Sequence, residues 1–249
     1  NLLNHSLPSI IKPQQHFDTL IWDGTNNASR DISGLQFNPD LVLIKNRVQA
    51  NTHSWQDSVI GFGDDKTLRV DTSNALDTNG NLYGYINYTL DNGINVNSGT
   101  DHGSSRVNSS SSGAKHVAWC WKAGGSSNTF NVDGVGYATA AAAGLTDGTI
   151  TPTGFSVGTK QGFSIIKYTG NGSSSQYVPH GLNETPDIIW HKNLSNTANW
   201  LVRTTAIDGS IDYSYLNTNG AFTNAGGDYT NAWTSTKFSI SSDSESNTN

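Results

Sequence analysis

The chain has 249 residues, a net charge of −6 and only 14% charged residues, against about 25% in ordinary soluble domains. It has no cluster of Lys or Arg, so a nucleic-acid-binding surface is not expected. Its apolar runs are four or five residues long, whereas a membrane-spanning helix needs roughly 20, so no membrane insertion is expected. Aromatic residues reach 10% and include seven Trp, which argues against a disordered chain.

The chain opens with residues 1–16, which contain two prolines and show neither helical nor strand periodicity. We interpret them as an N-terminal arm or as the tail of a preceding domain. They are therefore left out of the predicted folded modules.

Residues 17–122 combine short apolar runs with frequent turn signals, which is typical of a β-sandwich or jelly roll. FDTLIW, which begins at Phe17, is apolar on both faces and predicts an interior strand. Pro39 prevents ladder pairing just before DLVLIKN, the expected buried central strand. Further strands are predicted at 32–37, 54–60, 67–70, 82–88, 94–96 and 117–122.

Residues 123–162 form a connecting segment that begins AGGSSN and is rich in Gly, Ala and Thr. The composition fits either an ordered β-insertion or a semi-flexible linker. ATAAAAG at 138–144 has the length for about two helical turns. The apolar residues Tyr137, Ile150, Phe155 and Val157 favour partial docking on a neighbour.

From residue 163 onward the chain repeats itself: FDTLIWDG returns as FSIIKYTG, and GLQFNPDLVLIKN returns as GLNETPDIIWHKN. The offset is 146 at Phe17, 147 at Gly34, and 145 if Trp55 is matched with Trp200. Two copies of one folding unit predict an all-β protein of tandem, jelly-roll-like β-sandwich modules. Module 1 covers 17–122 and module 2 covers 163–249. Three pairs are expected at equivalent sites: Phe17 with Phe163, Leu35 with Leu182, and Trp55 with Trp200.

Copy 2 shows no counterpart of one element. In copy 1, GINV (93–96) is followed by HVAWCWKAG (116–124), whereas KFSI (237–240) in copy 2 is followed by no such run. Met is absent, so Asn1 is not expected to be a translation start. We expect a piece of a longer chain, truncated inside copy 2. Its bare edge would be completed by a continuation of the chain or by a strand from a neighbouring subunit.

The single Cys120 excludes an internal disulfide and lies in the apolar run VAWCW, which predicts a buried, inert thiol. The flanking Trp119 and Trp121 alternate with it along one strand. We expect at least one of these two indoles to pack in the core of module 1.

Metal and cofactor sites are not predicted. The spacing of His116 and Cys120 lacks a second ligand pair, and His180 and His191 have Ser33 and Ile44 as their counterparts in copy 1. DTNGN at 77–81 resembles the start of a calcium loop but has no bidentate Glu. Copy 2 has NTNGA at 217–221, which favours a hairpin turn and leaves a weak, copy-specific calcium site as the alternative.

Six polar or aromatic residues recur in both copies and are the candidate glycan contacts: Lys45, Asn46, Lys192, Asn193, Trp55 and Trp200. The structural interpretation is that the Lys-Asn pairs end the central strand and that each Trp is a core residue. The functional interpretation is that the pairs bind sugar hydroxyls and that the indoles stack on a pyranose face. Asp40 and Asp187, which follow proline in each copy, are expected to accept turn amides.

No enzymatic activity is predicted. Glu occurs only at Glu184 and Glu245, and no pair of carboxylates is embedded in an aromatic motif, as glycoside hydrolysis would require. The chain contains no GxSxG, P-loop or CxxC motif.

Six strings together resemble a repeated module of large structural proteins in marine, cyanophage-like bacteriophages, of the tail-fibre or virion type. They are FDTLIWDG, GLQFNPDLVLIKNR, HVAWCWKAG, VDGVGYATAAAAGLTDGTITPTG, GFSIIKYTGNG and VPHGLNETPDIIWHKN. The resemblance covers roughly residues 17–249. It implies a virion appendage with an extracellular location and supplies no catalytic residues.

We therefore expect a tail-fibre or appendage component that attaches to host-surface polysaccharide by non-covalent recognition. Its expected partners are other virion proteins and further copies of itself, with a trimer favoured, so that repetition turns weak contacts into avidity. The alternatives are a purely structural spacer or capsid-decoration protein, a polysaccharide-degrading enzyme, and a bacterial surface adhesin.

Overall fold

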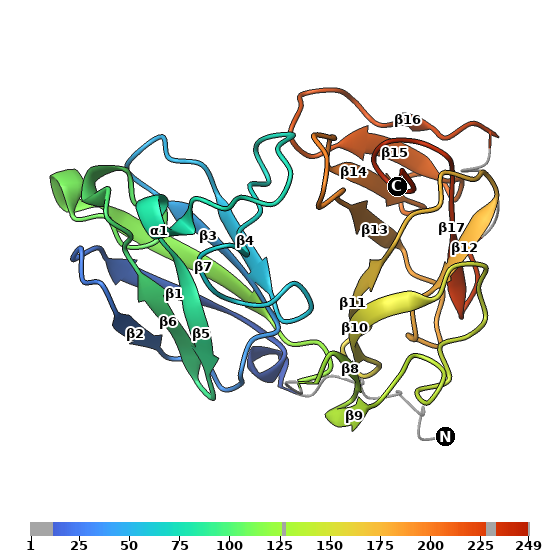
Figure 1. Ribbon diagram of the computed structural model, residues 1–249, viewed down its shortest axis with the longest axis horizontal. Helices are drawn as coiled ribbons and strands as arrows, with labels where there is room; N and C mark the ends of the chain where they lie inside the picture. Colours follow the sequence, from blue (N-terminus) through green and yellow to red (C-terminus); the bar gives the residue numbers. More distant parts are fainter. Residues whose placement is uncertain (1–11, 126–127, 228–232, 249) are drawn as a thin grey trace, which may run out of the picture.

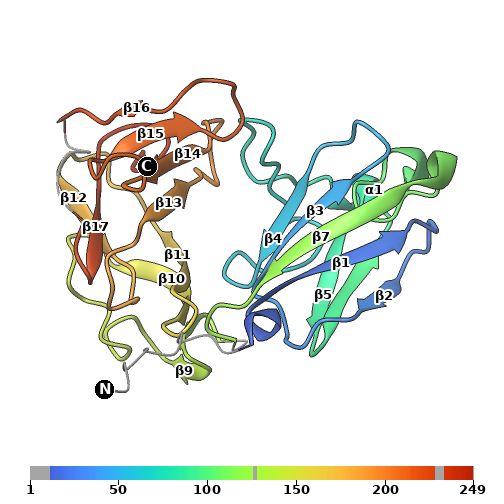
Figure 2. The same cartoon turned by 180° about the vertical axis from the view of Figure 1, so that it is seen from behind.

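The computed structural model describes residues 12–125, 128–227 and 233–248. Most of the arm predicted for 1–16 lies outside these residues. The protein is all-β, which confirms the predicted fold class, and Figures 1 and 2 show its two halves side by side. None of the helices in the described part of the chain is long and apolar enough to cross a membrane.

Module 1 is a sandwich of two antiparallel sheets. The first sheet contains, in spatial order, β1 (Phe17–Asp23), β7 (Lys115–Trp121), β3 (Leu41–Asn46) and β4 (Ser54–Asp57). The second contains β2 (Arg30–Ser33), β6 (Gly93–Asn97) and β5 (Tyr85–Leu90). Its short helical pieces are η1 (Pro13–Gln15), α1 (Gly80–Tyr83), η2 (His102–Ser104) and η3 (Ser111–Gly113).

The core of module 1 lies between these sheets because side chains alternate along each strand. Leu20 and Trp22 of β1 face inward, and so do Ala118 and Cys120 of β7. Cys120 is fully buried, as predicted. The small β7 residues leave room for the larger side chains that pack around them. These larger core residues are Ile32, Leu35, Phe37, Val42, Ile44, Ile86, Ile94, Val96 and Val107.

Several predictions for module 1 are wrong. Residues 67–70 form isolated bridges and not a strand, and helix α1 lies where a hairpin turn and the start of a strand were expected. β1 is an edge strand of its sheet, and Ile21 on its outer face is 65% exposed. Trp119 and Trp121 are half-buried and lie outside the core, because they alternate with the inward-facing Ala118 and Cys120. The apolar outer faces of these strands had suggested burial on both sides. The predicted central strand β3 is confirmed, since β7 and β4 flank it.

The connecting segment is an ordered β-insertion. It contributes β8 (Phe130–Val132), β9 (Val135–Tyr137) and β10 (Pro152–Gly158) to a sheet in the order β11-β10-β8-β9. Residues 138–144 form turns and not a helix. Phe155 and Val157 of β10 are fully buried against Leu182 of module 2, so the expected docking on a neighbour occurs.

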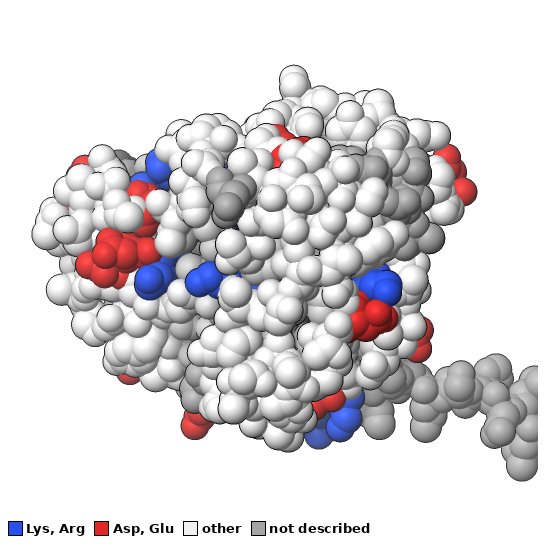
Figure 3. Space-filling model, turned by 45° about the vertical axis from the view of Figure 1, so that its right-hand side comes forward, with Lys and Arg blue, Asp and Glu red and all other residues white. Residues whose placement is uncertain are grey.

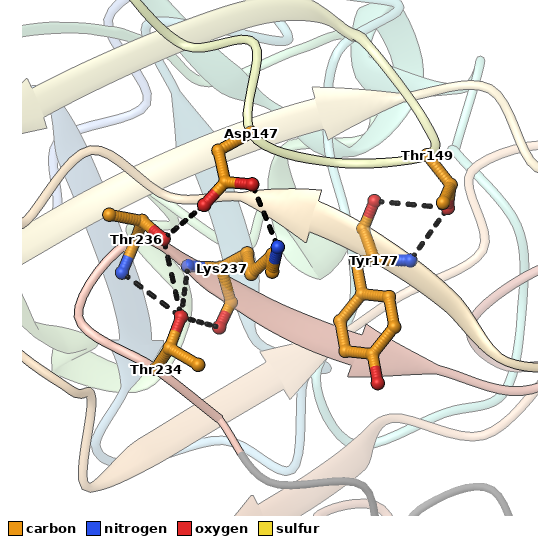
Figure 4. Close-up of polar contacts among 6 residues, drawn as sticks. All are labelled: Asp147, Thr149, Tyr177, Thr234, Thr236 and Lys237. Carbon is orange, nitrogen blue, oxygen red and sulfur yellow. Dashed lines mark hydrogen bonds and ion pairs between the residues drawn. The ribbon is translucent and has the colours of Figure 1, made fainter.

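A polar latch also ties the connecting segment to module 2, as Figure 4 shows. The carboxylate of Asp147 accepts a hydrogen bond from the Thr236 hydroxyl (2.6 Å) and pairs with the Lys237 ammonium (2.7 Å). The hydroxyl of Thr149 accepts a hydrogen bond from the amide of Tyr177 (2.8 Å).

The described residues of module 2 form seven strands. They are β11 (Phe163–Tyr168), β12 (Gln176–Pro179), β13 (Ile188–His191), β14 (Leu201–Thr204), β15 (Asp212–Tyr215), β16 (Thr223–Asn224) and β17 (Lys237–Ile240). β13 to β16 form one sheet, and β12 pairs with β17 in another. Val178, Phe238 and Ile240 are buried in the core that these sheets share.

The strand registers repeat between the modules. Leu41 faces Asp57 in module 1 as Ile188 faces Thr204 in module 2, which is an offset of 147 on both strands (188 minus 41, and 204 minus 57). Likewise, β2 pairs with β6 as β12 pairs with β17. By this register Trp55 corresponds to Val202, so the predicted equivalence of Trp55 with Trp200 is wrong. The boundaries predicted for the domains stay a prediction.

Asp40 joins module 1 to the connecting segment and offers a test of that joint. Its carboxylate, 3% exposed, accepts hydrogen bonds from the amides of Ala123 (2.7 Å) and Gly125 (3.0 Å) and from the hydroxyls of Ser58 (3.0 Å) and Ser156 (2.9 Å). We expect D40A to lower the free energy of unfolding by about 3 kcal/mol, because buried donors lose a charged acceptor.

The matched control is D187A, since Asp187 holds the corresponding place after proline and is exposed. We expect it to change the free energy of unfolding by less than about 0.5 kcal/mol. Chemical denaturation measures both variants, and equal effects would contradict this role of Asp40.

His116 should make module 1 sensitive to acid. Its ring is fully buried and stacks on Trp22 at 5.4 Å. Burial, and next the charge of Arg30, lower its pKa from 6.5 to about 4. Between these two values the unfolded chain binds the proton and the folded chain does not, so stability falls as the pH drops from 6.5 to 4.

This contribution amounts to about 3 kcal/mol. H116F keeps an aromatic ring beside Trp22 but cannot bind a proton. We expect the loss of unfolding free energy between pH 7 and pH 4 to be smaller in H116F by about that amount. The same pH dependence in both proteins would rule out His116 as the source.

Candidate functional site

Three indoles meet at the junction of the two modules. Trp200, in the loop before β14, is 2% exposed and donates its Nε1 hydrogen to the Arg69 carbonyl of module 1 (2.9 Å). Its ring lies 5.2 Å from that of Trp55 on β4, which in turn lies 5.8 Å from Trp190 on β13. Leu68 and Val70 complete the buried part of the junction.

The three indoles differ in exposure. Trp200 is buried, Trp55 is half-buried and Trp190 is 41% exposed. Burial of large aromatic surfaces stabilises the contact between the modules. The indoles of Trp55 and Trp190 together leave an aromatic surface in contact with solvent.

A buried carboxylate fixes the orientation of Trp55. Asp57 accepts hydrogen bonds from the Trp55 indole (3.1 Å) and from the amides of Ile60 (2.8 Å) and Val59 (3.0 Å). Burial raises the pKa of Asp57, although these hydrogen bonds oppose the shift. The contact at Oδ2 holds the ring in place on β4.

An open pocket of about 250 Å³ lies at the same junction. Its lining is mostly polar and comes from both modules: Arg69, Asn74, Ala75, Leu76, Asp77, Thr78, Asn79 and Thr197. Arg69 connects the pocket to the indoles, because its carbonyl accepts the hydrogen bond from Trp200. The pocket therefore offers amide and hydroxyl groups beside an aromatic cluster.

Asp77 in this pocket is held as a carboxylate. It accepts a hydrogen bond from the Arg106 guanidinium (2.5 Å) and lies 3.6 Å from that of Arg69. Burial alone would raise the pKa of Asp77, but the hydrogen bond and charge of Arg106 outweigh it and lower the pKa. The carboxylate that the calcium hypothesis required as a ligand is therefore paired with two arginines. The described residues contain no group of three His, Cys, Asp or Glu suited to hold a metal.

The Lys-Asn pairs perform the same task in both modules. The ammonium of Lys45 donates to the carbonyl of Asn51, and that of Lys192 donates to the carbonyl of Ala198 (2.8 Å). Both acceptors lie six residues after the lysine (51 minus 45, and 198 minus 192). Lys192 also donates to Ser73 of module 1 (3.2 Å), and burial lowers its pKa to about 8.

The asparagines close the loops that follow β3 and β13. Asn46 accepts hydrogen bonds from the amides of Val48 and Gln49 (3.0 Å each). Asn193 accepts from the equivalent pair of amides, at Ser195 and Asn196 (2.9 Å each). The recurrence of the two pairs is therefore explained by loop closure.

Two of the six predicted glycan contacts are unsuited to that role. Trp200 is 2% exposed and Asn46 is 1% exposed, so neither can contact a sugar. Trp55, Lys45, Lys192 and Asn193 are half-buried, and their contact with a glycan stays a prediction. Of the six, the junction brings Trp55 and Trp200 together.

Trp190 was missed because its counterpart in copy 1 is Leu43, and only residues shared by both copies were taken as candidates. The useful signal was a difference between the copies and not a shared residue, because copy 2 has an indole where copy 1 has an aliphatic side chain. Asp77, Thr78 and Asn79 of the pocket belong to DTNGN, for which the sequence predicts a hairpin turn or a weak calcium site and not a junction between modules. Thr197 carried no signal, because it reaches the pocket only through the arrangement of the modules.

The fold and the junction define an all-β protein of two similar sandwich modules with an aromatic surface between them. The chain belongs to the family described as a domain of unknown function, DUF7483, whose model matches residues 12–249. No curated protein and no solved structure matches the chain.

The two indoles at the ends of this cluster should differ in their effect on stability. W200A removes a buried ring and should cost about 3 to 5 kcal/mol of unfolding free energy. W190A removes a partly exposed ring of the same type and should cost less than about 1.5 kcal/mol. Thermal and chemical denaturation measure both, and a W190A loss as large as that of W200A would show that Trp190 is a core residue.

Proposed function

We propose that the protein is a component of a virion tail fibre or appendage that attaches to host-surface glycan without covalent chemistry. The observation that carries this proposal is the pair formed by Trp55 and Trp190, 5.8 Å apart and open to solvent at the junction. The resemblance to repeated modules of phage structural proteins supports the virion part of the proposal.

The chemistry of the junction suits a sugar. The C–H bonds on one face of a pyranose ring pack favourably on the electron-rich face of an indole. Asn74, Thr78, Asn79 and Thr197 in the neighbouring pocket offer neutral donors and acceptors for hydroxyl groups. Trp55 is held in position by Asp57, so little freedom is lost when a ligand binds.

The surface supports recognition through neutral groups. Figure 3 shows charged side chains in small, separate groups of both signs on a mostly uncharged face. A weakly charged surface contacts a neutral polysaccharide without large desolvation costs. A single site of this kind binds weakly, and assembly into a homo-oligomer, with a trimer favoured, would add avidity.

A second candidate is a purely structural spacer in the particle. It is favoured by one observation, which is that the polar candidates Lys45, Asn46, Lys192 and Asn193 all form hydrogen bonds within their own loops. A spacer needs rigid modules and a fixed junction, which Trp200 and Asp40 supply.

Binding of fragments of host-envelope polysaccharide to the full chain separates these candidates. We expect millimolar to micromolar binding by titration calorimetry, and a loss of at least about tenfold in W190A, since one stacked ring contributes about 1 to 2 kcal/mol. The control is F222A, which removes an aromatic ring of similar exposure (44%) outside the junction and should leave binding unchanged.

Equal losses in W190A and F222A would overturn the assignment to the junction. Absence of binding to any fragment would favour the spacer. Release of shortened saccharides would instead identify a polysaccharide-degrading enzyme.

A further inference from the structure

In module 1, β7 lies at the centre of its sheet, with β1 on one side and β3 on the other. It is antiparallel to both, and its Ala118 faces Leu20 of β1 and Ile44 of β3 at once. In module 2 the counterparts of these outer strands are β11 and β13. The sheets of the described residues place no strand between them, and they do not pair with each other.

β10 does not take the place of β7. In module 1 the His16 carbonyl accepts from the Lys122 amide (2.8 Å) and the Gly24 amide donates to Ala114 (2.9 Å), so even-numbered β1 residues bond toward β7. At an offset of 146 these correspond to Ser164, Ile166 and Tyr168 of β11.

β10 bonds to the other edge of β11. The Phe155 amide donates to Thr129 (2.9 Å), and the Val157 carbonyl accepts from Asp133 (2.9 Å), so the odd-numbered residues of β10 bond away from β11. Ser156 therefore bonds to its partner Ile165, an odd-numbered residue of β11. In the described part of the chain, no strand bonds to the even-numbered residues of β11 on the side of β13.

The alternation of backbone hydrogen bonds also shows which residues of β13 face β11. The Thr205 amide donates to the Asp187 carbonyl (3.0 Å), so odd-numbered residues of β13 bond to β14. The backbone groups of Ile188 and Trp190 point the other way, toward β11. Ile188 is 53% exposed, whereas its counterpart in module 1, Leu41, is 2% exposed.

The chain also approaches this space as it does in module 1. Asn108 accepts a hydrogen bond from the Thr25 amide (3.2 Å) and donates to the Asn27 carbonyl (3.2 Å), seven residues before β7 begins at Lys115 (115 minus 108). Asn247 repeats both contacts with Asn171 (2.9 Å) and Ser173 (2.5 Å).

A second contact is repeated at the same place. The Tyr168 hydroxyl donates to the Ser246 carbonyl (2.6 Å), as the Trp22 indole donates to the Val107 carbonyl (3.1 Å). The two modules are thus alike on both sides of the space that β7 fills in module 1.

We propose that module 2 is a strand acceptor, which binds one extended peptide segment between β11 and β13, antiparallel to both. The occupant is an extended peptide strand with the chemistry of β7, which no described strand of this chain supplies. By the module 1 register, two of its three inward side chains lie between Ser164 and Ile189 and between Ile166 and His191. These places are taken by Cys120 and Ala118 in module 1, so small apolar side chains are required there.

No described strand pairs with the facing edges of β11 and β13, so the bound strand would gain hydrogen bonds on its two sides. Its backbone would also cover Ile188, as β7 and its surroundings cover Leu41. This inference does not depend on glycan binding. The bound strand would, however, lie next to Trp190, which belongs to the proposed glycan surface, because Trp190 is the counterpart of Leu43, the partner of Trp119 on β7.

The probe is a synthetic peptide with the β7 sequence and the inner cysteine replaced by alanine, KHVAWAW, added to the full chain. A second arm fuses the same strand behind residue 249 through the last four residues that precede β7 (111–114), so that six residues separate Asn247 from the strand, as six separate Asn108 from β7. The control peptide, KHVDWDW, carries Asp at the two inward positions that correspond to Ala118 and Cys120, and it keeps the inward His and the outer face. Amide hydrogen exchange by NMR reads out the strand edges one residue at a time.

We expect the amides of Ser164, Ile166, Tyr168, Ile188 and Trp190 to exchange at least about tenfold more slowly with KHVAWAW or with the fused strand. The amides of Ile165 and Ile189, already bonded to β10 and β14, serve as internal controls and should not change. The fused strand should act more strongly because it is present at high effective concentration. The Asp peptide should have no effect.

Failure of both the free and the fused strand to slow these amides would overturn the proposal. Protection of the same amides in the chain alone would also overturn it: in a monomer it would mean that β11 and β13 pair directly, and in an oligomer that a second copy fills the space. Sedimentation analysis at the NMR concentration distinguishes these two outcomes.

Discussion

The fold depends on strands that hydrogen-bond to neighbouring strands through their backbones while one face of each sheet is covered by the opposite sheet. In module 1 this condition is met by β7, which bonds to β1 and β3 and contributes the small residues Ala118 and Cys120 to the apolar core. Small side chains on the central strand let the larger ones of the opposite sheet, such as Ile86 and Ile94, reach across. The sandwich closes because the central strand takes little room.

The two modules are joined by contacts of different kinds. Asp40 collects amides and hydroxyls from the connecting segment, Trp200 inserts an indole against module 1, and Lys192 reaches the carbonyl of Ser73. A buried carboxylate and a buried indole hydrogen bond are directional, so they fix orientation as well as contact. The aromatic surface of Trp55 and Trp190 exists only because this orientation is fixed, since each module contributes one of the two rings.

The sequence predicted the class of fold well, because alternation and turn residues act locally. β3, β7 and the repeat from β11 onward follow from short strings that need no knowledge of neighbours. The position of β1 at an edge and the outward direction of Trp119 did not follow, because both depend on which strands pair and which face is covered.

The candidate site was less accessible to sequence reasoning for a related physical reason. Recurrence in both copies selected residues such as Asn46 and Lys45, whose task is to close a loop in each module. A surface between two modules has no internal duplicate, since each copy contributes a different side to it. Trp190 differs from its counterpart Leu43, so recurrence does not select it. Thr78 and Asn79 of the pocket recur as Thr218 and Asn219, but recurrence does not show that they lie at the junction between the modules.

At one equivalent strand position the cores of the two modules contain different polar side chains, a neutral amide in module 1 and a charged guanidinium in module 2. Gln56 and Arg203 occupy the same register position, and both are fully buried. Gln56 exchanges hydrogen bonds with the backbone of Ile86. Arg203 instead donates to the Ser239 carbonyl (2.6 Å) and contacts His191 at 2.9 Å.

A buried guanidinium needs acceptors and tolerates no second positive charge nearby. Burial, and next the charge of Arg203, hold the pKa of His191 well below 6.5, so its ring is neutral at pH 7 and accepts a hydrogen bond from Arg203. The ring of Trp233, 5.4 Å from the guanidinium, adds a favourable cation–π contact. Module 2 therefore keeps the sandwich geometry of module 1 while exchanging an amide for a charge, because its neighbours supply the acceptors that the charge requires.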